Sequence, residues 1–120
     1  MSDVQQIAER YIAVWNETGA TARRSLIGEV FTPGARYTDP LGEVRGHDGI
    51  DQFIAGAQAQ FAGLGFSLPG AVDAHHDLAR FQWHLGAPGA EEPLAIGFDV
   101  IVVEDGRIAQ VHGFLDKLPG

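Results

Sequence analysis

The feature that most constrains the fold is the stretch from Leu94 to Asp116, where two apolar runs flank the dipeptide Asp105-Gly106. Asp-Gly between apolar runs favours a type I′ turn, because both central residues of that turn need a positive φ angle. The sequence therefore predicts a β-hairpin with arms at residues 94–104 and 107–116. The first arm is apolar at both alternating sets of positions, which is typical of a central strand.

A carboxyl group, Asp99, interrupts this apolar arm. An ionised carboxylate that is buried without a partner is unstable, so Asp99 must be paired, protonated or directed into a polar cavity. Two interpretations satisfy this requirement. Asp99 is either a structural acid with satisfied hydrogen bonds or a functional carboxyl group in a pocket.

Apolar residues recur with helical spacing from Val4 to Trp15, which predicts an amphipathic first helix. Ser2 and Gln5 have the spacing of a capping box at its start. Tyr11 and Trp15 lie one turn apart on the apolar face. Core packing explains both rings, but a buried tyrosine hydroxyl also needs a partner, which indicates a polar site beneath the helix.

Two further helices are predicted in the first half of the chain. One spans residues 21–30 and is ended by Pro33-Gly34. The other follows residues 46–49, and Asp48 or His47 is its predicted N-cap.

A short alternating strand at residues 35–39 lies between these two helices and ends at Asp39-Pro40. Pro40 restricts Asp39 to an extended conformation, which places the Asp39 carboxyl group at a strand end beside a turn. Aspartate is common in turns before proline. Asp39 also lies on the same face of the predicted strand as Ala35 and Tyr37, because every second residue points to one side. This position favours an inward direction for its side chain.

The remaining strands are predicted at residues 66–73, 78–86, 94–104 and 107–116. Three helices followed by a strongly curved antiparallel sheet predict a cone-shaped α+β fold, with a single domain over residues 1–120. A curved sheet covered by helices on one side leaves a hollow in which a small molecule can bind. The other side carries bulky apolar residues, so we expect a homodimer through the open sheet face.

Composition narrows the class of partner. The net charge of −8 disfavours nucleic acid and anionic membranes, which both attract cationic surfaces. No apolar run approaches the ~20 residues that a membrane span needs, the first residues lack the pattern of a signal peptide, and there is no cysteine. We therefore expect a cytoplasmic protein with a small-molecule ligand. No metal site is predicted, because the adjacent His75 and His76 would point to opposite faces of a strand.

Several motifs accompany this order of elements. They are Glu9–Ala13, Tyr37–Gly42, Arg45–Ile50, Gly97–Asp99, Asp105–Ile108 and Gly113-Phe114. Together they resemble the nuclear transport factor 2-like superfamily, and within it the SnoaL-like polyketide cyclases and ketosteroid isomerase. The resemblance covers nearly the whole chain. It implies the same helix-covered sheet, dimerisation through the open face and no cofactor.

Carried over residue by residue, the isomerase pattern implies three catalytic residues. Tyr11 and a protonated Asp99 would hold the oxyanion, and Asp39 would be the general base. The same alignment turns Arg80, Gln82 and His84 toward the cavity, where their polar groups disfavour a flat steroid. The full set expected to contact the substrate is Trp15, Tyr37, Phe53, Arg80, Gln82, His84, Ile101 and Val111. For the cyclase reaction the base stays open between His84, Asp99 and Asp39.

These residues suit the removal of a proton next to a carbonyl group, which needs a base and hydrogen-bond donors for the enolate oxygen. The sequence thus predicts an isomerase or cyclase acting on a small, neutral-to-polar carbonyl compound. Opening of an epoxide by an activated water uses similar carboxyl groups. The alternatives are a non-catalytic domain that binds a small ligand and a protein-interaction module of the transport-factor kind.

Overall fold

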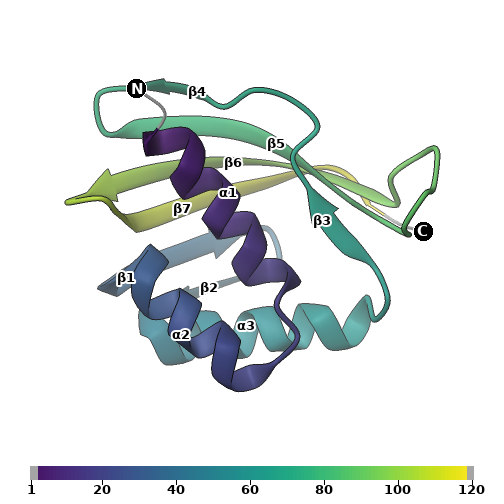
Figure 1. Cartoon of the computed structure of the whole chain (residues 1–120), viewed down its shortest axis with the longest axis horizontal. Coiled ribbons are helices and arrows are strands. Elements are labelled where there is room, and N and C mark those ends of the chain that lie inside the picture. The colour runs from purple at the N-terminus through teal and green to yellow at the C-terminus, as the bar shows by residue number, and fades with distance from the viewer. Residues whose placement is uncertain (1–2, 119–120) are drawn as a thin grey trace.

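The structure, a computed structural model, describes residues 3–118, and in that range the chain forms three helices and a seven-stranded sheet (Figure 1). The helices are α1 (Asp3–Asn16), α2 (Ala20–Val30) and α3 (Gly46–Gln60). The strands are β1 (Phe31–Asp39), β2 (Gly42–Arg45), β3 (Gly65–Ser67), β4 (Asp73–His75), β5 (Leu78–Gly86), β6 (Ala95–Glu104) and β7 (Arg107–Lys117). The predicted α+β architecture is confirmed.

The hairpin of β6 and β7 forms as predicted. Asp105 and Gly106 have φ angles of 51° and 80°, both positive, as the type I′ turn requires. β6 pairs with β5 on its other side, so it is an internal strand. Its buried positions alternate, and Asp99 lies among the residues that face the helices.

The order of the strands is β2-β1-β7-β6-β5-β3, and β4 also pairs with β5. β1 and β7 are parallel, with Tyr37 beside Val111, so the sheet is mixed where an antiparallel sheet was predicted. This parallel pair brings the end of β1, and with it Asp39, next to the central hairpin. In Figure 1, α1 lies across β5, β6 and β7, whereas α2 and α3 lie beside β1.

The prediction of one long strand at residues 66–73 is wrong. Two short strands, β3 and β4, stand in its place and pair with opposite ends of β5. Pro69 and Gly70 lie between them. Proline has no N–H to donate to a strand ladder and glycine weakens a strand, so the chain leaves the sheet there.

The predicted end of the second helix at Val30 is confirmed. Pro33 and Gly34 were expected to stop this helix, but they lie inside β1, where the pairing with β7 shifts its register between Phe31 and Arg36. Such an irregularity accommodates residues that a regular ladder disfavours.

The prediction that Asp48 or His47 caps the third helix is wrong, because the N-cap of α3 is Arg45 and it has no side-chain cap. His47 instead contacts the carbonyl oxygens of Phe31 and Thr32 through Nε2, at 3.2 and 3.0 Å. The predicted capping box of α1 includes Ser2, which lies outside the described residues.

The open face of the sheet carries Phe98 beside Phe114, and Phe114 is 56% exposed. The homodimer expected through this face stays a prediction. None of the helices within residues 3–118 is long and apolar enough to cross a membrane.

Candidate functional site

A cavity of about 420 Å³ lies between the helices and the sheet. Side chains from α1, α3, β1, β3, β5, β6 and β7 line it. Most of the wall is aromatic or aliphatic, and its rings belong to Tyr11, Trp15, Tyr37, Phe53, Phe61, Phe66 and Trp83. Its titratable groups include two carboxyls, Asp39 and Asp99, and among the described residues no Lys, Arg or His side chain lines it. This arrangement disfavours a ligand that carries carboxylate or phosphate groups, because no cationic side chain is there to balance them.

Tyr11 and Asp99 meet in the cavity through a buried hydrogen bond. The Tyr11 hydroxyl donates to Oδ2 of Asp99 at 2.8 Å. The two residues are only 1% and 2% exposed. The apolar periodicity of α1 turns Tyr11 inward, and the alternation of β6 turns Asp99 to the same side of the sheet.

Burial raises the pKa of Asp99 to about 7, above the usual range of a carboxyl group. Hydrogen bonding from Tyr11 and from Trp83 opposes this rise, and negative charge on Asp39 adds to it. Asp99 is therefore about half protonated at pH 7 and more fully below it, and the protonated form can donate a hydrogen bond. Burial and the Asp99 charge raise the pKa of Tyr11 well above its ordinary value, so this phenol also stays a donor.

Asp39 lies at the end of β1, half-buried at the edge of the cavity. The Tyr37 hydroxyl donates to its Oδ2 at 2.6 Å, and the backbone N–H groups of Leu41 and Gly42 donate to its Oδ1 at 2.8 and 3.1 Å. Asp39 thus forms the turn between β1 and β2 and also lines the cavity, so both sequence interpretations of its position hold. Three donors suit a carboxylate, since an ionised carboxyl group only accepts.

Gly113 on β7 lies between the two acids. A Cβ atom at this position would be 3.0 Å from Oδ1 of Asp99 and 3.1 Å from Cβ of Asp39. The missing side chain therefore leaves room for the Asp99 carboxyl group and for the Asp39 side chain. Tyr11, Asp39 and Asp99 share one cavity, as the sequence predicted, while their catalytic roles stay predictions.

Trp15, Tyr37 and Phe53 also line the cavity, as predicted. Ile101 and Val111 do not. They are paired across β6 and β7 and are fully enclosed in the core.

The prediction that Arg80, Gln82 and His84 face the cavity is wrong. The register pairs Phe81 with Asp99 and Trp83 with Gly97, so these two rings share the face of Asp99. Because successive side chains of a strand alternate, the three polar residues lie on the opposite face. His84 is thereby removed as a candidate base.

Trp83 and Phe66 line the cavity and were missed from the sequence. The sequence indicated only that Trp83 lies on the same face of its strand as Phe81. That this face is the one of Asp99 follows from the register with β6. Phe66 is held beside α1 by Asn16. The Asn16 side chain donates to the Phe66 carbonyl oxygen at 2.9 Å and accepts from the Phe66 N–H at 2.8 Å.

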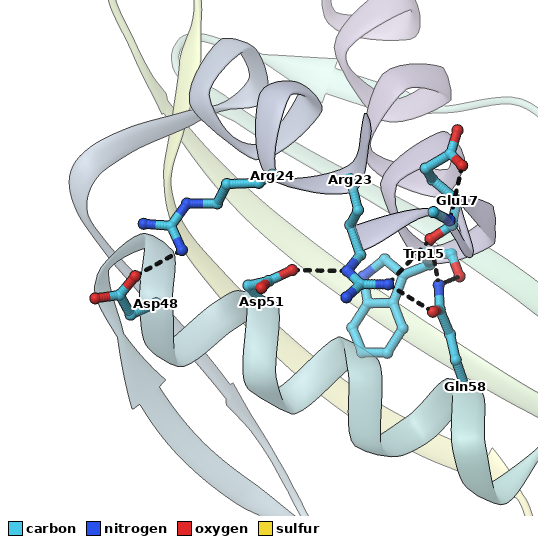
Figure 2. A network of polar contacts seen from close by, with 8 residues as sticks. Trp15, Glu17, Arg23, Arg24, Asp48, Asp51 and Gln58 are labelled. Carbon is cyan, nitrogen blue, oxygen red and sulfur yellow. Dashed lines mark hydrogen bonds and ion pairs between the residues drawn. The ribbon is translucent and has the colours of Figure 1, made fainter. Parts of the chain in front are cut away.

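A buried arginine joins the helices behind the cavity (Figure 2). Arg23 is 5% exposed and donates from Nε to Asp51 at 2.7 Å and from Nη1 to Gln58 at 2.8 Å. Gln58 in turn donates from Nε2 to the carbonyl oxygens of Trp15 and Glu17, at 2.9 and 2.8 Å. This network fixes the end of α1, with Trp15, against α3. No pattern around Arg23 in the sequence predicts this network, because arginine is seldom buried.

Within the part of the chain that the structure describes, no group of three or more His, Cys, Asp or Glu side chains could hold a metal ion.

Comparison with known proteins agrees with this fold. The family model for the SnoaL-like domain matches residues 8–111. A crystal structure of a provisionally named isomerase of the SnoaL-like family from Agrobacterium tumefaciens is 39% identical in sequence. The match covers 97% of this chain and 99% of that one, with a TM-score of 0.90. No curated protein sequence matches the chain.

More distant structures share the fold alone. A provisionally named ketosteroid isomerase from Kribbella flavida is 16% identical, covering 99% of this chain and 82% of that one, with a TM-score of 0.72. A provisionally named polyketide cyclase from Sinorhizobium meliloti is 18% identical, covering 90% and 93%, with a TM-score of 0.70. With its family model matched over most of its length, this chain belongs to the SnoaL-like domain family.

Proposed function

We propose that this protein is a cofactor-free isomerase or polyketide-cyclase-like enzyme that removes a proton from the carbon next to a carbonyl group. One observation carries the proposal: a buried phenol and two carboxyl groups in different environments line one cavity. Two titratable groups whose environments separate their protonation states are the recurring sign of an acid–base pair. The names of the similar isomerase and cyclase structures are consistent with this class of reaction.

In the proposed reaction Asp39 is the base. A carboxylate oxygen has a lone pair left beside the Tyr37 hydrogen bond and can take the proton from carbon. The electron pair of the C–H bond moves to the carbonyl oxygen and forms an enolate. Tyr11 and protonated Asp99 donate hydrogen bonds to that oxygen as its charge develops.

The enolate then has two possible fates. In an isomerase the proton returns from Asp39 to another carbon of the conjugated system. In a cyclase the enolate carbon forms a bond to a second carbonyl carbon, whose oxygen accepts the proton. Asp99 suits the donor role better than the base role, because it is buried at the phenol while Asp39 lies at the cavity edge.

A non-catalytic domain that binds a small ligand is the alternative. The observation that favours it is the turn at Asp39, where the three hydrogen bonds also suit a purely structural acid. Such a protein would use the same cavity without turnover.

Exchange of carbon-bound protons in D₂O tests the proposal without knowledge of the natural substrate. Bicyclic ketones such as 2-tetralone would be incubated with the protein and followed by mass spectrometry. We expect the wild-type protein to speed deuterium uptake and Asp39→Asn to lose that effect. Tyr11→Phe should reduce the rate by ~10²–10³, as expected for one oxyanion donor.

Asp48→Asn is the matched control, because Asp48 is exposed and pairs with Arg24 away from the cavity. Its exchange rate should equal that of the wild type. Undiminished exchange in Asp39→Asn would show that the base is wrongly assigned. Binding of 2-tetralone without any exchange would favour the non-catalytic alternative.

A further inference from the structure

Trp15 carries a hydrogen-bond donor that the resting site does not use. Its indole Nε1 is enclosed by protein, and no acceptor in the described residues is in hydrogen-bonding geometry with it. The residue is 8% exposed and lines the cavity. Unpaired buried donors are rare because they lose their hydration without replacement, so this N–H needs an explanation.

Packing explains the Trp15 ring but not its unpaired donor. The ring lies against Tyr37 and Phe66, with centroids 5.6 and 5.3 Å away. Its backbone carbonyl is held by Gln58 in the network of Figure 2. The indole is thus fixed from two sides and cannot turn its N–H outward to water.

Tyr11 is placed to provide the missing acceptor. It lies one helical turn before Trp15, and the two rings meet edge to face with centroids 6.4 Å apart. Burial and the charge on Asp99 raise the pKa of Tyr11, whereas the indole N–H of Trp15, which faces the Tyr11 oxygen without full hydrogen-bonding geometry, lowers it. The Tyr11 oxygen gives its own proton to Asp99 and keeps lone pairs that can accept.

We propose that Trp15 is a positioning residue whose Nε1–H donates to the Tyr11 oxygen when a ligand binds. The Tyr11 hydroxyl then shifts toward the fixed indole and turns its own proton from Asp99 to an anionic oxygen of the ligand. The hydrogen bonds then form a chain from Trp15 through Tyr11 to the ligand. Each bond in such a chain polarises the next, so Trp15 strengthens the donor that touches the ligand. The inference rests on the proposed function only in placing the ligand oxygen at Tyr11 and Asp99.

The indole proton itself reports this bond. The chain has two tryptophans, so two indole signals are expected in an ¹H–¹⁵N spectrum, and Trp83→Phe assigns them. The probe is 2-naphthol, whose ionised oxygen resembles an enolate. Saturation with 2-naphthol should move the Trp15 indole proton downfield in the wild type, and in Tyr11→Phe it should not.

Variants measure the same coupling through binding. Trp15→Phe keeps a ring and removes the N–H, so the affinity for 2-naphthol should fall about fivefold, as for one ordinary hydrogen bond. The absorbance of bound naphtholate should fall as well, because weaker donation from Tyr11 leaves a smaller fraction of the bound 2-naphthol ionised. In a Tyr11→Phe background the same substitution should have no effect, whereas a purely structural role of Trp15 would persist there.

Three results would overturn the inference. If 2-naphthol binds and the Trp15 indole signal does not move downfield, the inference fails and the proposed function stands. If Trp15→Phe lowers the affinity equally in the wild type and in Tyr11→Phe, the inference likewise fails and the proposed function stands. If 2-naphthol does not bind at all, the oxyanion site fails, and the proposed function fails with it. Should Trp15→Phe not fold, the wild-type spectrum still decides.

Discussion

The hydroxyl group of Tyr11 donates a 2.8 Å hydrogen bond to Oδ2 of Asp99, a residue 88 positions later in the chain. This contact joins the first helix to an internal strand of the sheet at the cavity. Both side chains are buried. The folded chain therefore holds a carboxyl group whose ionisation is opposed by its surroundings, and this has consequences for stability and binding.

The stability of the protein should fall as Asp99 ionises. An unfolded aspartate has a pKa of about 3.9, whereas Asp99 titrates at about 7 in the fold. Between these values the folded chain keeps a proton that the unfolded chain releases. The stabilisation is thus fully present below the unfolded pKa and is lost as the pH rises through about 7, with a limiting slope of about 1.4 kcal/mol per pH unit.

Urea denaturation of the wild type and of Asp99→Asn isolates this contribution, because asparagine does not titrate and the other carboxyl groups are shared. From about pH 4 to about pH 7, the wild type should lose stability relative to the variant. A difference between the two proteins that is independent of pH would contradict the raised pKa of Asp99.

A methyl group at Gly113 should disturb both acids. Gly113→Ala places a Cβ atom at 3.0 Å from Asp99 and 3.1 Å from Asp39, so one side chain must move. We expect a loss of about 1–3 kcal/mol in the free energy of unfolding, as for overpacking, together with weaker binding of 2-naphthol.

Gly28→Ala is the control for Gly113→Ala, because a Cβ atom there meets nothing within 4 Å. Gly28 lies inside α2, and alanine is the better helix former there, so this variant should gain up to about 1 kcal/mol. Thermal unfolding measures both changes. Equal effects of the two substitutions would mean that the two acids do not need the space beside Gly113.

Two neighbouring arginines should differ sharply in their contribution to stability. Arg23 and Arg24 both pair with aspartates of α3, but the Arg23 pair is largely buried and the Arg24 pair is exposed (Figure 2). Arg23→Met leaves Asp51 and Gln58 without their donor and should cost about 3 kcal/mol. Arg24→Met should cost less than about 1 kcal/mol. Denaturant midpoints of the two variants provide the comparison. Similar midpoints would contradict the inference that the buried Arg23 network holds α1 against α3.

Much of the site could be predicted because it depends on local patterns. The apolar spacing of the first helix placed Tyr11 inward, and the alternation along residues 94–104 placed Asp99 on the buried side. The Asp105-Gly106 turn fixed the central hairpin. Pro40 placed Asp39 at a strand end.

What the sequence missed depends on pairing between distant segments. The face of Arg80, Gln82 and His84 is decided by the register of β5 against β6, and a shift of one residue would exchange the two faces. Burial of Arg23 needs Asp51 and Gln58 from another helix, so its own neighbours in sequence do not indicate it.

Direct titration of the Asp99 carboxyl carbon by ¹³C NMR, with Asp99→Asn to assign the signal, tests the central claim of a protonated acid beside Tyr11. The account predicts a midpoint at about 7. A midpoint at about 4, the value of an ordinary exposed aspartate, would contradict it.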